Sequence, residues 1–196
     1  MIVGLTGGIG SGKTTVLKIF SAIGNIAIYN ADVEAKKLMQ TSQIIQRKII
    51  EFFGEKSYVN GLLNRSYISS IVFNDTTKLV ALNAIVHPEV FKHFKAFVAD
   101  NSAKDYVLYE NAILFENNSN SLCDIVVFVS VEKEERIKRV MQRDMVSREL
   151  VLERIQNQWS DTKKEIQSNY IVFNSDKKAL KPQIVRIHNI LTKKTC

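Results

Sequence analysis

The sequence predicts an α/β fold with a doubly wound, five-stranded and mainly parallel sheet, and three observations support this. Short apolar stretches alternate with stretches of helical periodicity, which is typical of parallel strands joined by helical crossovers. Residues 125–129 form an unbroken apolar run, as expected of a strand buried on both faces. A glycine-rich turn, residues 7–12, separates the first apolar stretch from the first helical pattern. The expected strands are residues 2–5, 26–29, 106–110, 125–129 and 170–173.

The helices are predicted from their end signals as well as from their periodicity. The first begins at about Lys13 and ends at Gly24, which is placed as the C′ residue. Asp32 is placed to cap a second helical segment, which extends to about residue 53 with a break near residues 41–42. Later helices are expected at residues 132–144, 147–168 and 177–191.

Residues 32–101 are interpreted as a helical insertion between the second and third strands. From Arg65 to Asn101 the apolar residues recur at helical spacing, and no stretch has the pattern of a strand. Pro88 suits the first turn of a new helix within this segment. The core of the fold is therefore expected to comprise residues 1–31, 102–144 and 169–196.

Composition restricts the class of protein. Hydrophobic residues make up 45% of the chain and charged residues 24%, as in ordinary globular proteins. No apolar run approaches membrane-spanning length, and the N-terminus lacks the pattern of a signal peptide. The two cysteines, Cys123 and Cys196, argue against a disulfide framework and favour a reducing cytoplasm. We therefore expect a cytoplasmic protein that does not associate with membranes.

The net charge of +7 has two explanations, which are nucleic acid binding and the attraction of a polyanionic nucleotide into a cleft. Aromatic and basic residues are not interleaved as they are on nucleic-acid-binding surfaces, so a nucleotide is favoured and no nucleic acid partner is expected. Part of the excess, Lys193-Lys194, is interpreted as a solvated end of the chain.

Residues 7–14 match the phosphate-loop pattern Gly-x-x-x-x-Gly-Lys-Thr at every position. Glycines let successive backbone amides turn inward and cradle phosphate oxygens, and the dipole of the following helix adds to this anion site. Lys13 supplies a cation for the β- and γ-phosphates, and the Thr14 hydroxyl is a hard oxygen ligand for Mg²⁺. A bare turn would explain neither residue. The expected ATP-binding residues of this stretch are Gly8, Gly10, Ser11, Gly12, Lys13, Thr14 and Thr15.

Three carboxylates follow strands of the predicted sheet. In doubly wound folds ligands bind at the carboxyl ends of the strands, so Asp32 could accept a proton from an attacking hydroxyl or help to hold Mg²⁺. The alternative for Asp32 is a plain helix cap, and spacing alone does not separate the two. Glu110 and Glu116 could orient metal-bound water or a substrate hydroxyl, with surface solvation as the alternative, especially for Glu116.

The helix expected at residues 132–144 carries Arg136, Arg139 and Arg143 at spacings that place them on one face. Guanidinium groups neutralise the charge that develops during phosphoryl transfer, and we rank Arg143 and Arg139 ahead of Arg136 for this role. The alternative is a solvated basic face paired with neighbouring glutamates. His87 is either a substrate contact or a ring packed at a helix start, and Trp159 is assigned a packing role only.

These residues together resemble one family, the dephospho-CoA kinases. The family's opening and its Asp-Ala-Asp, Gly-x-Leu-Asp-Arg, Leu-x-x-Ile-x-His-Pro and Asp-Ile-Pro-Leu-Leu-Phe-Glu segments have counterparts in the same order, followed by its lid motifs. The matching stretches are residues 5–13, 31–32, 61–65, 72–73, 82–88, 110–116, 139–144 and 154–158.

The resemblance implies that ATP phosphorylates the ribose 3′-hydroxyl of dephospho-CoA in the last step of coenzyme A synthesis. Asp32 would then be the base, Lys13 and the loop amides would hold ATP, and Thr14 would hold Mg²⁺. Arg143 would stabilise the transferring phosphoryl group. The implied roles of other residues are Arg139 in the nucleotide site, Asn174 beside the adenine, His87 and Glu110 at the substrate, and residues 145–168 as a water-excluding lid.

Four positions depart from the family pattern, and Asn30 is the most consequential of them. It replaces the first Asp of Asp-Ala-Asp and leaves one carboxylate where the family usually offers two, so a lower affinity for Mg²⁺ is expected. The other departures are Asn64, Glu110 and Ala112.

Three other functions compete with this interpretation. A nucleoside or nucleotide kinase would share the loop and the lid, but not the stretches between residues 61 and 116. A regulatory GTPase is disfavoured because the chain contains neither Asn-Lys-x-Asp nor Asp-x-x-Gly. A nucleic acid binder would show an affinity that falls steeply with salt and does not depend on ATP.

Overall fold

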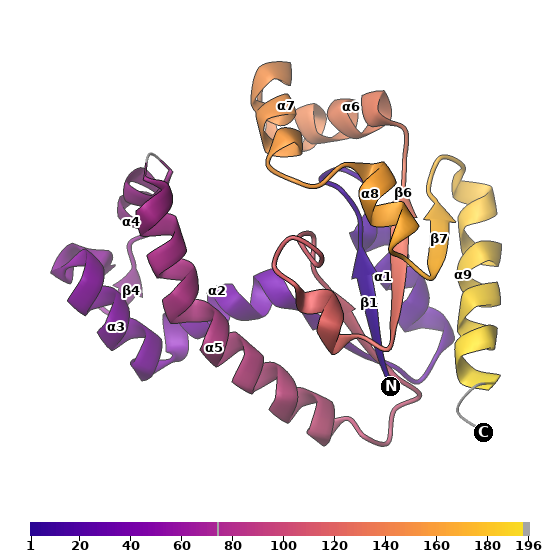
Figure 1. Cartoon of the computed structure of the whole chain (residues 1–196), viewed down its shortest axis with the longest axis horizontal. Helices are drawn as coiled ribbons and strands as arrows, with labels where there is room; N and C mark the ends of the chain where they lie inside the picture. Colours follow the sequence, from indigo (N-terminus) through magenta and orange to yellow (C-terminus); the bar gives the residue numbers. More distant parts are fainter. Residues whose placement is uncertain (74, 194–196) are drawn as a thin grey trace. The chain divides into compact units, whose positions relative to one another are not determined.

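The computed structural model describes residues 1–73 and 75–193, and the chain divides into two compact units (Figure 1). One unit combines Met1–Tyr29 with the chain from Asn101 onward, and the other is Asn30–Asp100. Lys194 and Cys196 lie outside the described residues. No helix in residues 1–73 and 75–193 has both the length and the apolar character needed to cross a membrane.

The first unit is built on a five-stranded sheet, as predicted. The strand order is β2-β5-β1-β6-β7, and β1 pairs in parallel with both β5 and β6, as β6 does with β7. The strands are β1 (Ile2–Thr6), β2 (Ala27–Asn30), β5 (Val107–Glu110), β6 (Ile125–Ser130) and β7 (Tyr170–Phe173). Each expected strand is present within one or two residues of its expected bounds, because unbroken apolar runs are typical of strands buried on both faces.

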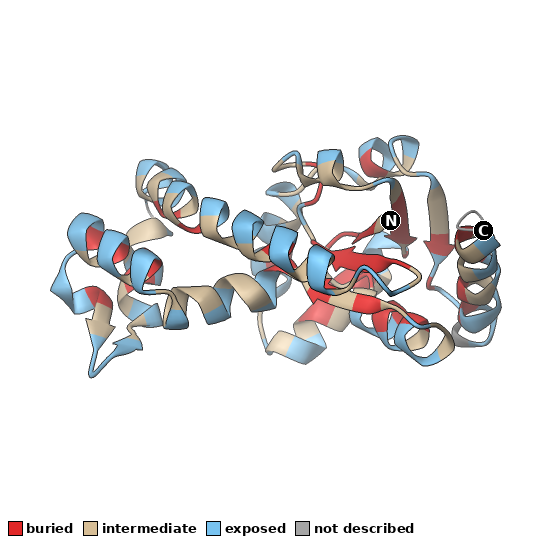
Figure 2. Cartoon of the chain, turned by 90° about the horizontal axis from the view of Figure 1, so that it is seen from below, coloured by how far each residue is buried: buried red, intermediate tan, exposed pale blue. Residues whose placement is uncertain are grey.

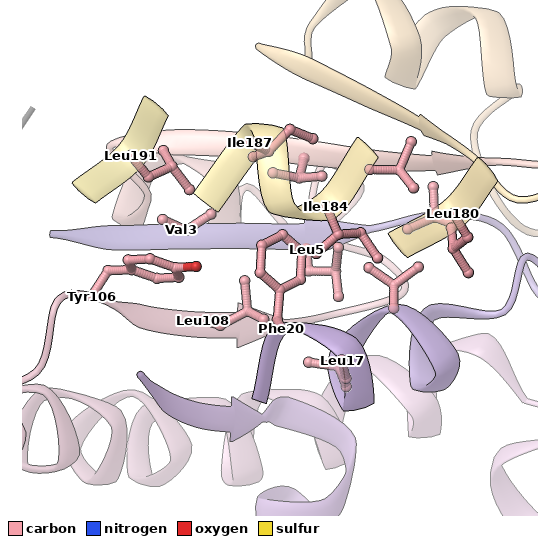
Figure 3. Close-up of a cluster of buried hydrophobic side chains, with 14 residues drawn as sticks. Val3, Leu5, Leu17, Phe20, Tyr106, Leu108, Leu180, Ile184, Ile187 and Leu191 are labelled. Carbon is pink, nitrogen blue, oxygen red and sulfur yellow. The ribbon is translucent and has the colours of Figure 1, made fainter. Parts of the chain in front are cut away.

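Helices α1 and α9 pack on one face of this sheet and enclose a buried apolar cluster (Figure 3). From β1, Val3 and Leu5 point into the cluster, and Phe20 of α1 meets the ring of Tyr106 edge to face at 6.5 Å between centroids. Burying each such side chain stabilises the fold by about 1.5–3 kcal/mol. The helices of this unit are α1 (Lys13–Ile23), η2 (Ser119–Leu122), α6 (Lys133–Asp144), α7 (Arg148–Gln156), α8 (Asp161–Ile166) and α9 (Lys177–Lys193).

Gly24 ends α1, but not in the left-handed conformation expected of a C′ glycine. Its φ is −143° and its ψ is 161°, which is extended backbone that any residue adopts. The need for glycine arises instead from packing, because a Cβ at this position would lie 2.4 Å from Cε1 of His188 in α9.

The second unit has its own apolar core, centred on buried side chains such as Ile45, Ile49 and Phe53. Buried positions recur at helical spacing along its helices with exposed positions between them (Figure 2). Ser42 caps α3, as the predicted break near residues 41–42 requires. Its elements are α2 (Ala31–Thr41), α3 (Gln43–Phe53), η1 (Glu55–Ser57), β3 (Tyr58–Val59), β4 (Leu62–Leu63), α4 (Arg65–Val72) and α5 (Thr76–Asp100).

A small antiparallel hairpin of β3 and β4 lies within the segment that was expected to be helical. Its two-residue turn is Asn60-Gly61, with φ of 51° and 75°. Both residues therefore have the positive φ of a type I′ turn, for which Asn-Gly is the preferred sequence. The strands are only two residues long, too short to produce an alternating pattern that sequence analysis could detect.

Pro88 does not begin a new helix, so that prediction is wrong. Helix α5 runs without interruption from Thr76 to Asp100 with Pro88 in its interior. A proline there removes one backbone hydrogen bond and costs about 3 kcal/mol. Leu82 and Val86, before the proline, are buried in the core of this unit, and Val90, after it, packs against the same core, so packing on both sides of the proline offsets that cost.

Candidate active site

The phosphate loop occupies the turn between β1, which ends at Thr6, and α1, which begins at Lys13. Gly10 and Gly12 have φ of 79° and 86°, a left-handed conformation that L residues with side chains rarely adopt. No side chain in the described part of the chain caps the N-terminus of α1. The first-turn amides of this helix are therefore placed to bind an anion.

Lys13 and Ser11 supply the side-chain chemistry of the loop. The Lys13 ammonium donates a hydrogen bond of 2.9 Å to the carbonyl oxygen of Gly7 and lies 3.9 Å from a carboxylate oxygen of Glu110, a buried residue at the end of β5. The Ser11 hydroxyl is buried and has no hydrogen-bond partner among residues 1–73 and 75–193. Thr14 is exposed in the first turn of α1, with Thr15 beside it.

Asn174 supports the loop from the end of β7. Its side-chain amide donates to the carbonyl oxygen of Ser11 at 2.8 Å, and its own backbone amide donates to Ser130 at 2.9 Å. A Cβ on Gly12 would lie 2.1 Å from the Asn174 amide nitrogen, so Gly12 is needed for this close approach as well as for its φ. This contact could not be predicted from the sequence, because residues 11 and 174 are far apart in the chain.

The three arginines of α6 have different environments. Arg139 is half-buried, pairs with Glu135 at 2.9 Å and donates to the carbonyl oxygen of Asn174 at 3.2 Å. Arg143 is exposed and forms two hydrogen bonds with Asp144, which raise the pKa of its guanidinium above its usual range. Arg136, ranked last from the sequence, is buried and donates to the carbonyl oxygen of Ile9 in the loop.

Exposed ion pairs connect α6 with α7. Arg154 donates to Asp144 at 2.8 Å, and Arg148 forms two hydrogen bonds of 2.8 Å with Glu134. The bond from Arg148 holds the pKa of the Glu134 carboxyl group below its usual range, and the bonds from Arg143 and then Arg154 do the same for Asp144. Pairs in such exposed positions contribute little to stability, so α7 is held on α6 mainly by Val151, which is buried against Ile137 and Val140.

A buried ion pair fastens α8 to the segment that follows β5. The Lys164 side chain is fully buried, and its ammonium lies 2.7 Å from Glu116 and 3.1 Å from the carbonyl oxygen of Ala112. Glu116 also accepts a hydrogen bond from the backbone of Trp159, whose ring stacks on Phe115. The surface interpretation of Glu116 is therefore wrong, whereas the packing role of Trp159 agrees with this contact.

Asn30, not Asp32, caps α2. The Asn30 side-chain oxygen accepts a hydrogen bond of 2.9 Å from the backbone amide of Val33, and Asp32 lies exposed in the first helical turn. The cap interpretation of Asp32 is therefore wrong, because the residue two positions earlier is at the N-cap. His87 is exposed on α5, one residue before Pro88.

Within residues 1–73 and 75–193, no three or more His, Cys, Asp or Glu side chains gather as a metal site. A metal ion that is bound mainly by phosphate oxygens and water needs only one or two protein ligands, which is typical of Mg²⁺ in kinases. The exposed Thr14 hydroxyl at the start of α1 fits that requirement.

Many enzymes contain a phosphate loop, so the family of this chain is identified by comparing its sequence with known families. The family model described as dephospho-CoA kinase matches residues 1–179. The chain belongs to the dephospho-CoA kinase family. The family predicted from the sequence motifs is thus confirmed, and membership in a kinase family implies ATP as the co-substrate.

Relatives within the dephospho-CoA kinase family align over nearly the whole chain. A dephospho-CoA kinase from Bacteroides fragilis is 32% identical over 192 residues, which are 98% of this chain and 93% of that protein. One from Leptospira interrogans is 38% identical over 174 residues, covering 88% of this chain and 84% of that protein.

Solved structures agree with the fold. A protein from Thermus thermophilus superposes with a TM-score of 0.87 at 29% identity, covering 97% of this chain and 96% of that chain. A dephospho-CoA kinase from Campylobacter jejuni gives a TM-score of 0.73 at 23% identity, with coverages of 100% and 98%. A shikimate kinase from Bacteroides thetaiotaomicron, at 0.53 and 14% with coverages of 97% and 98%, shares the fold alone. The predicted phosphate-loop kinase fold is confirmed.

Proposed function

We propose that this member of the dephospho-CoA kinase family transfers the γ-phosphoryl group of ATP to the ribose 3′-hydroxyl of dephospho-CoA, giving coenzyme A and ADP. The observation that carries the proposal is the loop between β1 and α1, with two left-handed glycines, an uncapped helix N-terminus and Lys13 beside it. This arrangement suits a triphosphate, because backbone amides at a helix N-terminus and a nearby ammonium group both attract phosphate oxygens.

The loop residues hold ATP in this mechanism. The amides at the start of α1 and the Ser11 hydroxyl donate to phosphate oxygens, and Lys13 neutralises charge on the β- and γ-phosphates. The Ser11 hydroxyl supports this role because it is buried and has no hydrogen-bond partner in the described part of the chain. Such a donor costs free energy until a ligand accepts a hydrogen bond from it. In this proposal Asn174 contacts the adenine, and its side-chain amide also supports the loop through the carbonyl oxygen of Ser11.

Asp32 acts as the general base for the acceptor. Its exposed carboxylate follows β2 by two residues, and it takes the proton of the ribose 3′-hydroxyl as that oxygen attacks the γ-phosphorus. Because Asn30 already caps α2, the Asp32 carboxylate is not required for helix capping. Residues 32–101, including His87, hold dephospho-CoA together with Glu110.

Arginines of α6 and the segment that follows complete the site. Arg143 stabilises the charge on the transferring phosphoryl group, and Arg139 contributes to the nucleotide site beside Asn174. Residues 145–168 form a lid that excludes water during the transfer. The exposed ion pairs between α6 and α7 support this motion, because they are weak enough to break and re-form.

Thr14 is proposed as the protein ligand of Mg²⁺. A magnesium ion held there would supply positive charge that neutralises part of the charge of the phosphates. The Thr14 hydroxyl suits such an ion because it is an exposed hard oxygen at the start of the helix that follows the loop.

A substrate panel tests the proposed reaction. We expect ATP-dependent and Mg²⁺-dependent phosphorylation of dephospho-CoA at a kcat/KM well above that for any nucleoside monophosphate or nucleoside, measured by coupled ADP release and by mass spectrometry of the product. Faster turnover of a nucleoside monophosphate would reassign the chain to a different acceptor. Salt-sensitive, ATP-independent nucleic acid binding without kinase activity would refute the enzyme proposal.

Replacing Asn30 with Asp should lower the Mg²⁺ concentration that gives half-maximal activity, by about two- to tenfold. An Asp side chain can accept the same bond from Val33 and cap α2 equally well, so the helix should be unaffected. The added carboxylate supplies a second hard oxygen ligand near the site. Magnesium titration of kcat measures the effect, with Asn64→Asp, which changes a second cap asparagine in the same way, as the control. An unchanged magnesium dependence would remove residue 30 from the metal site.

A further inference from the structure

Arg136 is a buried cation among the exposed charged residues of α6. Only 3% of its surface is exposed, whereas its neighbours Lys133 and Lys138 lie in solvent. Burying a guanidinium is unfavourable unless the charge is paired and its N–H groups have acceptors. Arg136 has both, since it forms an ion pair with Asp161 at the start of α8 and donates to the loop.

Two contacts fix the two successive peptide groups that flank the Cα of Ile9. The Arg136 Nε donates to the carbonyl oxygen of Ile9 at 2.9 Å, and the Ile9 amide donates to the side-chain oxygen of Gln158 at 2.9 Å. The guanidinium also lies against Gly8, where an added Cβ would come within 2.1 Å of it. The path of the backbone at residues 8–9 is therefore set by Arg136 and Gln158.

An anion site built from backbone amides requires that carbonyl oxygens point away from the anion. The Ile9 carbonyl has a charged donor behind it, so the guanidinium holds this dipole in place before any ligand arrives. Without that donor the peptide group between Ile9 and Gly10 could rotate. The fraction of molecules whose loop can bind ATP would then fall. The apparent affinity for ATP would fall by the same factor.

We propose that Arg136 and Asp161 act as a pair of positioning residues for ATP binding, in which Arg136 holds the Ile9 carbonyl and Asp161 neutralises the buried guanidinium. The assignment rests on the proposed function only in taking ATP as the ligand of the loop. It gives Arg136 a role different from phosphate contact, which belongs to Arg139 and Arg143. The pair also links the loop to α8, which lies at the far end of the segment proposed as the lid.

The test uses two double variants that both remove the ion pair. Arg136→Gln with Asp161→Ala keeps a neutral donor for the Ile9 carbonyl, whereas Arg136→Met with Asp161→Ala keeps only the bulk of the side chain. Neither leaves a buried charge unpaired, so both are expected to fold. Calorimetric titration with Mg-ATP should give a Kd within about threefold of the original for the Gln variant and at least about tenfold weaker for the Met variant.

Melting temperatures separate positioning from stability. We expect the two double variants to melt within a few degrees of each other, so that the difference in Kd reflects the bond to Ile9. Lys138→Gln removes an exposed cation from the same helix and should leave the Kd unchanged. Equal Kd values for the two double variants, or a loss of affinity that parallels a loss of melting temperature, would overturn the proposal. Because dephospho-CoA is absent from the titration, normal ATP binding without phosphorylation of dephospho-CoA would refute the proposed function alone.

Discussion

Replacing Asp32 with Asn is expected to lower kcat by about 10²–10⁴-fold while the Kd for ATP stays nearly unchanged. The side chain keeps its shape but can no longer accept the proton of the acceptor hydroxyl. ATP binding depends on the loop of the first unit, so it should not respond. Folding should be little affected, because Asn30 caps α2. Asp32 contributes only the favourable interaction of a negative charge with the helix N-terminus, which stabilises a helix by about 0.3–1 kcal/mol.

Glu34→Gln is the matched control for this variant. Glu34 is the other carboxylate in the first turn of α2, so its loss tests the helix-dipole effect without touching the proposed base. We expect its kcat to match that of the unmodified protein. Steady-state kinetics and titration with ATP, run on both variants, measure the two effects. If Asp32→Asn turned over at the original rate, Asp32 could not be the base.

Replacing Lys13 with Ala should reduce kcat/KM for ATP by about 10²–10³-fold, or roughly 2.7–4 kcal/mol of transition-state stabilisation. Lys13 is the one loop side chain that can place a positive charge on the β- and γ-phosphates, where negative charge develops during transfer. The Glu110 carboxylate, 3.9 Å from the ammonium, would also lose a neighbouring cation, which makes the site more repulsive to phosphate.

Lys18→Ala provides the comparison for Lys13. It removes an exposed lysine from the same helix, so it accounts for the change in net charge and in helix propensity. Its kcat/KM is expected to stay within about twofold of the original, as surface substitutions usually have small effects. A Lys13→Ala enzyme as active as Lys18→Ala would mean that the loop does not bind the triphosphate.

The sequence predicted the sheet well because its signal is local. Each strand is an apolar run, and the loop has a fixed spacing of glycines before Lys13, so neither needs knowledge of distant residues. The family followed from ordered motifs for the same reason. The continuity of α5 was predicted wrongly. Pro88 is a local signal for a helix end, and packing of the apolar face overrides it.

Contacts between distant residues could not be predicted from the sequence. Nothing in the chain indicates that Asn174 supports Ser11, or that Arg136 holds Ile9, because these contacts arise only when β7 and α6 lie beside the loop. The α6 arginines share one helical spacing, and spacing alone gives no measure of burial. The assignment of the α2 cap failed for a different reason, as Asn30 and Asp32 are both good caps and only the backbone decides between them.

Gly8 and Arg136 restrict each other sterically. Unlike Gly10 and Gly12, Gly8 is not in the left-handed region, and the three atoms nearest to a Cβ added there all belong to the Arg136 guanidinium. Alanine at position 8 is thus opposed by one neighbour rather than by the backbone. If the arginine were replaced first, position 8 could later accept a larger residue. In the reverse order, the intermediate protein would contain a clash between the new side chain at position 8 and Arg136. Substitutions at the two sites should therefore be epistatic, and the order in which they occur should matter.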